Sequence, residues 1–467
     1  MTRYTQLARF GLFDGCAPRY TSFPTAPQFA GGVTPTVFTD WVRAIPEGAT
    51  ISLYLHVPFC RRLCWFCACR TQGTASDLPV IAYVKTLQAE LAVLARHLPK
   101  RVRFSRLHWG GGTPALLRPG LIRDLAGTIL DIAPLADNAE FSVEIDPSEV
   151  DEARLDALAA AGMNRASIGV QDFDPLIQKT IGREQGFALT RDVVGMIRAR
   201  GVASLNADIL FGLPHQTAPR IAASVQQLLS LSTDRVALYG YAHVPWMSRR
   251  QKMIPSEALP TPQERLTLFQ VARDLFRADG YQDIGIDHFA TPTDGLAVAA
   301  RTGHLRRNFQ GYTDDTAPIL IGLGASSISR FPQGYAQNVP GNAEYTKSVR
   351  AGHFATHRGH IFAGQDLLRA RIIEALMCDF RVTRAELDRY GVARPVVEEM
   401  LATGAAAFPG MVRLDDAALT ILDHAHPLTR VIARGFDAYD QTKAQHSAAI
   451  LGCPRVDTFE NAYKSNA

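Results

Sequence analysis

The chain has 467 residues, of which 47% are hydrophobic and 20% are charged, and its formal net charge is +4. This length allows a large catalytic domain and a smaller one, and the composition is that of a globular protein, not of a disordered or fibrous one. The small net charge gives no reason to expect a nucleic-acid-binding protein, although a local basic pocket for an acidic substrate is compatible with it.

The N-terminal segment, MTRYTQLARFGLFDGCAPRY, lacks the continuous apolar core of a signal peptide. No run of about 18 apolar residues occurs further along the chain, so we expect a cytoplasmic protein without a membrane span. In that compartment, clustered cysteines bind metals or react more often than they form disulfides. Cys16, Cys378 and Cys453 stand alone in the sequence and are expected to be buried or incidental thiols.

Residues 1–48 are rich in proline, threonine and aromatic residues and predict an extended N-terminal arm. After the arm, short β-rich runs alternate with helical patterns. The expected strands cover residues 50–57, 104–110, 141–146, 165–170, 204–210 and 235–241. Between the first two strands, apolar residues recur at steps of three and four and predict one helix. They are Val80, Val84, Leu87, Leu91, Leu94 and Leu98.

Alternation of strands and helices predicts right-handed βαβ units and a parallel sheet. Six units are too few for a closed eight-stranded barrel, so the predicted α/β fold is a partial (β/α)6 TIM-like barrel over residues 49–350. Functional groups gather at the carboxyl ends of parallel strands. The conspicuous motifs follow predicted strands: the cysteines after residue 57, GGGTP after 109, EIDP at 144–147, QDF at 171–173 and GLP at 212–214.

From about residue 355 the sequence becomes mainly helical in pattern. The stretches DLLRARIIEALMCDF and VVEEMLATGAAAF predict helices. We therefore expect a small, mainly helical C-terminal domain over residues 355–460, with a short hairpin near residues 412–414.

Three of the clustered cysteines, Cys60, Cys64 and Cys67, have the spacing C-x3-C-x2-C. Thiolates so close together on a loop can surround one compact soft-metal centre. Three ligands on a four-iron cluster leave one iron open, as a catalytic metal requires. A structural zinc site normally recruits a fourth ligand, and no second Cys/His pair of that type is apparent. Cys69 is close, but the pair Cys67-x-Cys69 is an awkward bite for one centre, so we do not expect Cys69 on the cluster.

The motif C-x3-C-x2-C after a strand resembles that of the radical S-adenosylmethionine (radical SAM) enzymes, whose fold is the partial barrel predicted above. Further motifs resemble one subgroup, the oxygen-independent coproporphyrinogen III oxidases, in order from about residue 18 to 340. These are PRYTSFPT, SLYLHVPFCRRLCWFCAC, HWGGGTP, EIDP, LNADILFGLPHQT, YGYAHVPW, GIDHFA and RNFQGY.

The resemblance implies that the three cysteines hold a [4Fe-4S] cluster and that the open iron binds S-adenosylmethionine, whose cleavage gives a 5′-deoxyadenosyl radical. Two S-adenosylmethionine molecules are implied for each substrate. Gly112, Thr113, Ala242 and Ile328 are the contacts most plausibly shared between them. The full set of implied S-adenosylmethionine contacts is Tyr54, Gly111, Gly112, Thr113, Glu144, Gln171, Arg183, Asp208, Ala242 and Ile328.

Physical reasons support several of these positions. Glycine lets a backbone approach a ligand closely and leaves N–H groups for a carboxylate. Glu144 suits an ammonium group, and Asp208 suits ribose hydroxyls as an acceptor. Without the resemblance, Glu144 is an ordinary strand end, and Ala242 and Ile328 are barrel core.

The implied reaction converts two propionates of coproporphyrinogen III to vinyls with loss of two CO2, in porphyrin and haem biosynthesis. The implied catalytic set is Tyr54, His56, Cys69, Phe309 and Gln310. His56 shares a strand face with Tyr54. Because arginines pair with carboxylates through two hydrogen bonds, three arginines are candidates for the substrate propionates: Arg19, Arg306 and Arg307.

The resemblance also implies a low-potential electron donor, which the sequence does not identify, and a monomer. Three alternatives stay open. A related haem chaperone keeps the three cysteines, but such relatives lack the PRYTSFP arm and the Cys67-x-Cys69 pair. A radical haem-degrading methyltransferase fits less well with NFQGY and GIDHFA. A structural zinc protein is the third alternative.

Overall fold

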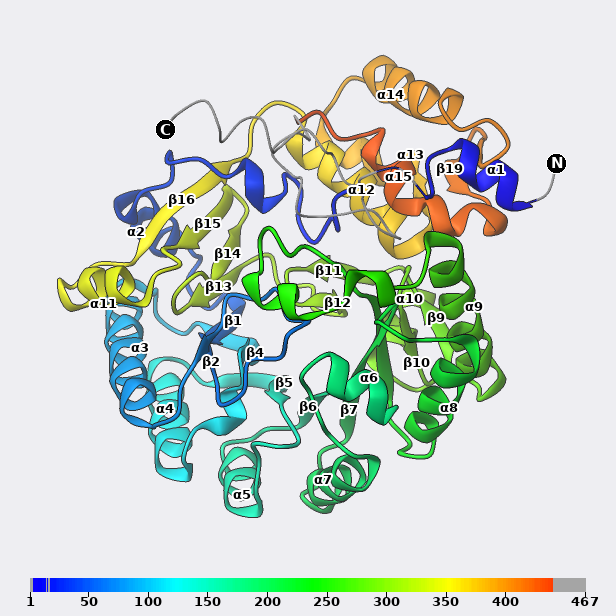
Figure 1. The fold of residues 1–467 in the computed structure, drawn as a ribbon. Coiled ribbons are helices and arrows are strands. Elements are labelled where there is room, and N and C mark those ends of the chain that lie inside the picture. The colour runs from blue at the N-terminus through cyan, green and yellow to red at the C-terminus, as the bar shows by residue number, and fades with distance from the viewer. Residues whose placement is uncertain (1–2, 14, 16, 440–467) are drawn as a thin grey trace, which may run out of the picture.

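The computed structural model describes residues 3–13, 15 and 17–439 (Figure 1). Cys16 and Cys453, which were expected to be incidental thiols, lie outside the described residues, as does the end of the expected C-terminal domain. Cys378 is buried, as expected.

All six predicted strands are confirmed. They are β1 (Thr50–Val57), β4 (Arg103–Gly111), β5 (Leu135–Ile145), β6 (Arg165–Gln171), β7 (Ser204–Phe211) and β8 (Arg235–Gly240). They pair in parallel in chain order. Their carboxyl ends therefore meet at one edge of the sheet, where the predicted site residues are concentrated.

The sheet is wider than predicted. It has twelve strands in the order β16-β15-β14-β13-β1-β4-β5-β6-β7-β8-β10-β9, and it stays open because β16 and β9 form its two edges. β13 joins β1 in parallel, and the other additional strands pair antiparallel. Their bounds are β9 (Gln282–Ile284), β10 (His288–Ala290), β13 (Leu320–Leu323), β14 (Ile328–Phe331), β15 (Gly334–Asn338) and β16 (Thr356–Ile361). They have three to six residues each, which is too short for a clear alternating pattern.

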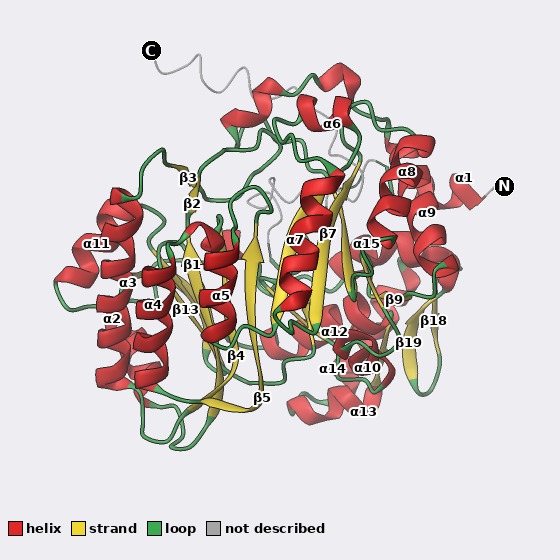
Figure 2. Ribbon diagram, turned by 90° about the horizontal axis from the view of Figure 1, so that it is seen from below, coloured by secondary structure: helices red, strands yellow, loops and turns green. Residues whose placement is uncertain are grey.

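Helices cover the outside of the barrel (Figures 1 and 2). They are α3 (Leu78–His97), α4 (Pro119–Ile132), α5 (Glu152–Ala160), α7 (Phe187–Ala199), α8 (Ala218–Leu229), α9 (Pro262–Ala278) and α11 (Asn342–Arg350). The short helix α6 (Pro175–Thr180) lies at the carboxyl ends of the strands (Figure 2), and α10 (Gly295–Arg301) packs beside β9. The predicted helix is α3, and its apolar stripe from Val80 to Leu94 is buried. By length and composition α3 is the one described helix that could cross a membrane, but half of its apolar window is buried in the protein, and core helices pass the same test.

The N-terminal segment is not extended throughout. It contains α1 (Arg3–Arg9) and α2 (Pro35–Arg43), so the extended conformation predicted for these residues is wrong. Pro35 begins α2, and Thr34 caps it by accepting a hydrogen bond from the Val37 N–H. Proline fits the first turn of a helix, where its missing N–H is not needed. Phe38 of α2 is fully buried against the rings of Phe331 and Phe354.

The C-terminal part contains α12 (Asp366–Asp379), α13 (Arg384–Leu387), α14 (Arg394–Ala406) and α15 (Thr429–Arg434). The predicted hairpin is formed by β18 (Val412–Leu414) and β19 (Ala418–Ile421), with β17 (Arg381–Thr383) as a third strand. The N-terminal arm packs on this part: the Phe10 and Phe408 rings lie 5.7 Å apart, and the Tyr20 hydroxyl donates to Asp437 at 3.0 Å. Two small sheets complete the fold, β2 (Phe59–Cys60) with β3 (Gln72–Gly73), and β11 (Arg306–Asn308) with β12 (Gly311–Thr313).

Candidate active site

The loop that carries the cysteines lies at the carboxyl end of β1, between β2 and β3. Two backbone hydrogen bonds attach the GGGTP turn to it: the Gly112 N–H donates to the Val57 carbonyl at 2.9 Å, and the Thr113 N–H donates to the Phe59 carbonyl at 2.8 Å. The two motifs therefore form one rigid unit.

Each of the three predicted ligand thiols has a donor beside it. The Thr113 hydroxyl lies 3.7 Å from Cys60 Sγ, Arg183 Nη1 lies 3.5 Å from Cys64 Sγ, and the Cys69 N–H donates to Cys67 Sγ at 3.4 Å. Such donors stabilise thiolate sulfur. Burial nevertheless raises the pKa of Cys60 to about 11 and raises that of Cys64. A metal centre held by these thiols would supply the compensating charge, because metal binding deprotonates a thiol.

The three thiols have the donor chemistry of an iron–sulfur centre. Cys60, Cys64 and Cys67 line one cavity, and thiolates are the ligands that hold such clusters in proteins. The residues present therefore fit the implied [4Fe-4S] cluster.

Arg183 is held on several sides beside this cavity. Its guanidinium lies 3.2 Å from Asp146 and donates to the Gly169 carbonyl at 2.9 Å and to Gln185 Oε1 at 3.1 Å. Burial lowers the pKa of Arg183, but the charges of Asp146 and of the nearby thiols outweigh burial, and the pKa is raised overall. Arg183 is thus a fixed positive charge beside Cys64.

Glu144 is oriented by two donors at the end of β5. Its carboxylate accepts from the Gly111 N–H at 2.9 Å and lies 3.3 Å from His108 Nε2. Burial raises the pKa of Glu144, but these partners outweigh it and the pKa stays below its ordinary value. The carboxylate is therefore ionised and suits a cationic group of a ligand.

Tyr54 and His56 lie on the same side of β1, as predicted. The Tyr54 hydroxyl is 3.0 Å from His56 Nδ1, and the Tyr54 ring stacks on His108 with 5.6 Å between centroids. Burial lowers the pKa of His56, so the ring is neutral at physiological pH.

Glycine is required at two positions of the GGGTP turn. Gly111 has φ of +112°, and a Cβ there would lie 2.5 Å from the His56 ring. A Cβ on Gly112 would lie 2.5 Å from the Phe59 carbonyl oxygen. The sequence suggested that these glycines let a ligand approach the backbone closely. In the structure, it is the His56 ring and the Phe59 carbonyl that lie close to them.

Two cavities meet at the carboxyl edge of the barrel. The cysteine cavity has a volume of about 190 Å³, and its wall includes Gly111, Gly112, Thr113, Gln171 and Arg183. The inner cavity has a volume of about 290 Å³ and extends down the barrel; its wall includes Tyr54, Tyr239, His288, Gln310 and Tyr312. Four residues line both: Cys69, Glu144, Ser167 and Asp208. Cys69 is therefore exposed to the cavities at their junction.

Four residues of the predicted catalytic and cofactor sets line neither cavity: His56, Ala242, Phe309 and Ile328. The Ala242 carbonyl accepts from Gln251, which also donates to the Phe66 carbonyl in the cysteine loop. The Ile328 backbone packs against Gly322, which pairs with Tyr54. Phe309 lies with its ring edge toward Tyr335 and lines a smaller neighbouring cavity.

Charged side chains form the floor of the inner cavity. Arg165 donates to Glu140 at 2.9 Å and Arg106 donates to Asp314 at 2.8 Å. Burial raises the pKa of Glu140, but the surrounding arginines outweigh it and lower the pKa to about 2. Asp208 higher in the cavity differs: burial raises its pKa to about 6 in spite of a hydrogen bond from Asn206.

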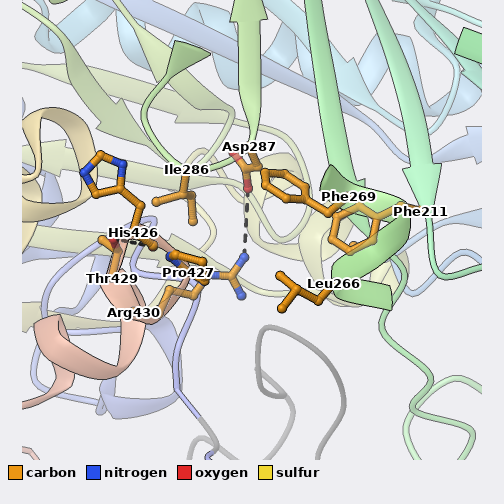
Figure 3. A pocket seen from close by; sticks show the side chains of 10 residues that line it. Phe211, Leu266, Phe269, Ile286, Asp287, His426, Pro427, Thr429 and Arg430 are labelled. Atoms are coloured by element: carbon orange, nitrogen blue, oxygen red, sulfur yellow. Dashed lines mark hydrogen bonds and ion pairs between the residues drawn. The ribbon is translucent and has the colours of Figure 1, made fainter. Parts of the chain in front are cut away.

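Asp287 lies next to His288 of the inner-cavity wall and connects the barrel to Arg430 of α15. Asp287 Oδ1 lies 2.8 Å from His288 Nδ1, and Arg430 Nη2 approaches Asp287 Oδ2 at 3.9 Å. Figure 3 shows Arg430 pointing at Asp287 across a cavity of about 60 Å³ that is also lined by Leu266 and Phe269. Burial lowers the pKa of Arg430 to about 10.

Sequence reasoning missed His108, Asp146, Asp287 and His288. His108 lies within the HWGGGTP motif and Asp146 within EIDP, so their motifs were recognised without these side chains being selected. Alternation, which places every second residue of a strand on the same face, would have pointed to His108 within β4 and to Asp146, two residues after Glu144 and just past the end of β5.

Comparisons with known proteins agree with this arrangement. The family model of the Radical SAM superfamily matches residues 54–228. The chain is 63% identical over 451 residues to an oxygen-independent coproporphyrinogen III oxidase of Paracoccus denitrificans, covering 96% of this chain and 100% of that protein. A protein of the same name from Cereibacter sphaeroides is 58% identical, with 94% and 98% covered.

A solved structure extends the likeness to the fold. The coproporphyrinogen III oxidase of Escherichia coli, described as a radical SAM enzyme, superimposes with a TM-score of 0.86 at 35% identity, covering 90% of this chain and 98% of that one. This chain therefore belongs to the radical SAM superfamily and, within it, to the family of oxygen-independent coproporphyrinogen III oxidases.

Proposed function

We propose that this chain converts two propionates of coproporphyrinogen III to vinyls with loss of two CO2, using two S-adenosylmethionine molecules for each substrate. The observation that carries the proposal is the junction of the two cavities, where Cys69, Glu144 and Asp208 face the cysteine cavity and the inner cavity together. A radical formed in one cavity would reach a substrate in the other without crossing solvent.

In this proposal Cys60, Cys64 and Cys67 hold the [4Fe-4S] cluster. When bound there, the cluster and S-adenosylmethionine supply the 5′-deoxyadenosyl radical that removes a hydrogen atom from the substrate. Glu144 holds the amino group of S-adenosylmethionine, and Asp208 accepts from its ribose hydroxyls. Gly111, Gly112, Thr113, Gln171 and Arg183 line the same cavity, which supports their assignment as cofactor contacts.

For the second S-adenosylmethionine, the proposed contacts are Gly112, Thr113, Ala242 and Ile328. Gly112 and Thr113 line the cysteine cavity. The backbone carbonyl of Ala242 is linked through Gln251 to the cysteine loop, so the proposed contact of Ala242 is made by its backbone.

The electron donor would reach the site from outside, and cysteine usage supports a cytoplasmic location. We also propose that the protein is a monomer.

The inner cavity is the proposed substrate site, with Tyr54, Cys69 and Gln310 of its wall beside the reacting propionate. His56 does not line this cavity and would act through its contact with the Tyr54 hydroxyl. A smaller cavity with three arginines, Arg306, Arg307 and Arg330, adjoins it and shares Asn308, Thr313, Asp315 and Leu320 with it. We call this smaller cavity the arginine annex. With Asp315 as its one carboxylate, the annex has an excess of positive charge, which supports a role in binding propionates.

Arg307 is the best candidate in the annex. It is 8% exposed, its guanidinium carbon lies 4.4 Å from the centre of the Tyr312 ring, and its Nε and Nη1 have no hydrogen-bond partner. Arg306 donates to the carbonyls of Gly303 and Leu305 instead. Buried donors without partners are costly, so a carboxylate at Arg307 would stabilise the complex.

The proposal is tested by anaerobic reconstitution with reductant, S-adenosylmethionine and coproporphyrinogen III. Protoporphyrinogen IX and 5′-deoxyadenosine are expected together, with two 5′-deoxyadenosine molecules for each product. A Cys64→Ser change should abolish both the iron content and the product, because the remaining two thiols cannot hold the cluster. Tight haem binding without either product would support a haem chaperone instead, and zinc without iron would support a structural zinc protein.

A further inference from the structure

The motif GIDHFA, residues 285–290, places a histidine on the wall of the inner cavity. His288 begins β10 and is 6% exposed. Its ring packs against the rings of Tyr239 and Tyr312, with centroids 5.3 Å and 4.9 Å away and interplanar angles of 82° and 81°. Tyr312 is itself fixed, because its hydroxyl donates to the Met377 carbonyl at 2.7 Å. The imidazole of His288 is therefore held in one orientation.

Asp287 determines which ring nitrogen of His288 carries the proton. Asp287 Oδ1 lies 2.8 Å from His288 Nδ1. Burial raises the pKa of Asp287, but the contact with His288 and two nearby arginines outweigh burial and lower the pKa to about 2. One of these arginines, Arg430 of α15, points at Asp287 in Figure 3. Because an ionised carboxylate only accepts hydrogen bonds, Nδ1 of His288 is the donor.

The other ring nitrogen of His288 keeps its lone pair. Burial lowers the pKa of His288, so the ring is neutral at physiological pH and carries one proton, the one on Nδ1. Among the described residues, the only hydrogen-bond neighbour of Nε2 is the Tyr239 hydroxyl, at the long distance of 3.4 Å. Gly311 of the NFQGY motif has no side chain to cover Nε2, and a Cβ there would lie 3.5 Å from it. Nε2 is thus an acceptor without a strong partner.

The chemistry of the proposed substrate indicates which of its groups fits this acceptor. The propionates are ionised at neutral pH and carry no proton, so they accept hydrogen bonds and suit the arginines. The donors of coproporphyrinogen III are its four pyrrole N–H groups. A neutral imidazole with a free lone pair is complementary to an N–H group and not to a carboxylate.

We propose that His288 Nε2 accepts a hydrogen bond from a pyrrole N–H of the tetrapyrrole, and that Asp287 is a positioning residue that keeps this nitrogen free of a proton. The inference rests on the proposed function, because it takes coproporphyrinogen III to bind in the inner cavity. The contact fixes the orientation of the ring system, while the arginines hold its edge.

This contact would also make the site specific for the reduced ring system. The saturated bridging carbons of a porphyrinogen let each pyrrole tilt and turn its N–H outward. In a planar porphyrin, the two remaining N–H groups point at the centre of the ring. Coproporphyrin III therefore has the same four propionates but no N–H that could reach His288.

The test measures binding without turnover. Cluster-reconstituted enzyme is dialysed to equilibrium without oxygen or reductant, and Kd is measured for coproporphyrinogen III and for coproporphyrin III by porphyrin fluorescence, after oxidation in the first case. In His288→Asn the amide takes the place of Nδ1 and leaves nothing at the position of Nε2. In His288→Gln the amide reaches the position of Nε2 and can accept there. The matched control is His360→Asn, because His360 contacts Asp366 at 2.8 Å and lines neither the inner cavity nor the arginine annex.

His288→Asn should raise Kd for coproporphyrinogen III by about tenfold and change Kd for coproporphyrin III by less than about twofold. His288→Gln should stay within about threefold of the unchanged protein. Asp287→Asn can donate to Nδ1 and so move the proton to Nε2, and it should weaken coproporphyrinogen III about as much as His288→Asn. The control should bind both ligands as the unchanged protein does. With dithionite as reductant, KM for coproporphyrinogen III should follow the Kd values.

Three results would overturn the inference and leave the proposed function standing. Equal losses in His288→Asn and His288→Gln would show that the shape of the ring matters and not its acceptor. Equal weakening of coproporphyrin III would show that the N–H groups are not what His288 contacts. A raised KM for S-adenosylmethionine with an unchanged Kd for coproporphyrinogen III would assign His288 to the second cofactor molecule. If the unchanged protein binds no coproporphyrinogen III, the proposed function fails and this inference fails with it.

Discussion

At the scale of single residues, two of the carboxyl groups that line the inner cavity, those of Asp208 and Glu140, have opposite electrostatic environments. Burial raises the pKa of Asp208 to about 6, whereas arginines outweigh burial and lower that of Glu140 to about 2. A raised carboxyl pKa means that the folded state binds the proton more tightly than the unfolded state. The contribution of Asp208 to stability is therefore lost as pH rises from about 4 to about 6, and above that range the penalty stays constant. Glu140 stabilises the fold above its unfolded pKa and loses this contribution as pH falls toward 2.

Asp208→Asn should therefore raise the free energy of unfolding at pH about 7.5, by about 1–3 kcal/mol, and should weaken S-adenosylmethionine binding. Glu140→Gln should lower the free energy of unfolding at the same pH, because Arg165 loses its buried partner. Urea unfolding of both variants without S-adenosylmethionine, at pH about 5 and about 7.5, measures the two signs. A lower free energy of unfolding for Asp208→Asn at the higher pH would contradict this, because it would show that the folded protein stabilises the ionised carboxylate of Asp208.

Arg306 and Arg307 are adjacent but differ in what their guanidiniums contact. Arg307→Gln should raise KM for coproporphyrinogen III by about tenfold or more, as expected for the loss of a buried charged hydrogen bond of about 1.5–3 kcal/mol. Arg306→Gln is the matched control and should change KM by less than about threefold. Steady-state kinetics with excess S-adenosylmethionine distinguish the two. Equal effects would remove Arg307 as the specific anchor.

At the scale of elements, a buried ion pair joins β8 to α10 below the inner cavity. Arg235 Nε lies 2.6 Å from Asp294, and both side chains are 3% exposed. Asp294 also caps α10 by accepting from the Leu296 N–H at 2.8 Å. Because asparagine caps helices as well as aspartate does, Asp294→Asn removes the charge and keeps the cap.

Asp294→Asn should lower the free energy of unfolding by about 3 kcal/mol, since it removes the carboxylate that is in direct contact with buried Arg235. Asp283→Asn is the control: Asp283 pairs with Arg277, whose side chain is 51% exposed, and its loss should cost less than about 1 kcal/mol. Chemical denaturation followed by far-UV circular dichroism measures both. A loss below about 1 kcal/mol for Asp294→Asn would mean that water or a neighbouring group compensates Arg235.

At the scale of the whole molecule, the arm, the barrel and the helical C-terminal part share one continuous core. The same hydrophobic cluster contains Leu7, Val84, Leu238 and Phe436. We therefore expect a fragment of residues 49–350 to aggregate or to melt at least about 10 °C below the full chain, because its uncovered core faces water. Thermal melts of the fragment and of the full chain provide the comparison. A fragment with an unchanged, cooperative melt would establish the barrel as an independent domain.

Patterns within short stretches of sequence predicted much of the fold and the cysteine motif, whereas most candidate site residues came from the resemblance to a family. Local patterns predicted the six parallel strands. The spacing of Cys60, Cys64 and Cys67 is likewise local, and these cysteines follow the end of β1, where parallel sheets place functional groups. Partners across strands were not predictable in the same way: His108 orients Glu144 from 36 residues away. The proline-rich composition of residues 1–48 predicted an extended arm, although Pro35 begins α2. The short additional strands such as β14 carry too few residues for a period.

The wall that the two cavities share has a consequence for engineering and for the evolution of new substrates. Any change at Glu144, Ser167 or Asp208 made to admit a different tetrapyrrole would also reshape the cavity assigned to the cofactor. Leu53, Leu107 and Leu320 line the inner cavity and are absent from the wall of the cysteine cavity. New specificity is therefore most accessible through these three leucines, where the shape of the substrate site can vary while the radical-generating half stays unchanged.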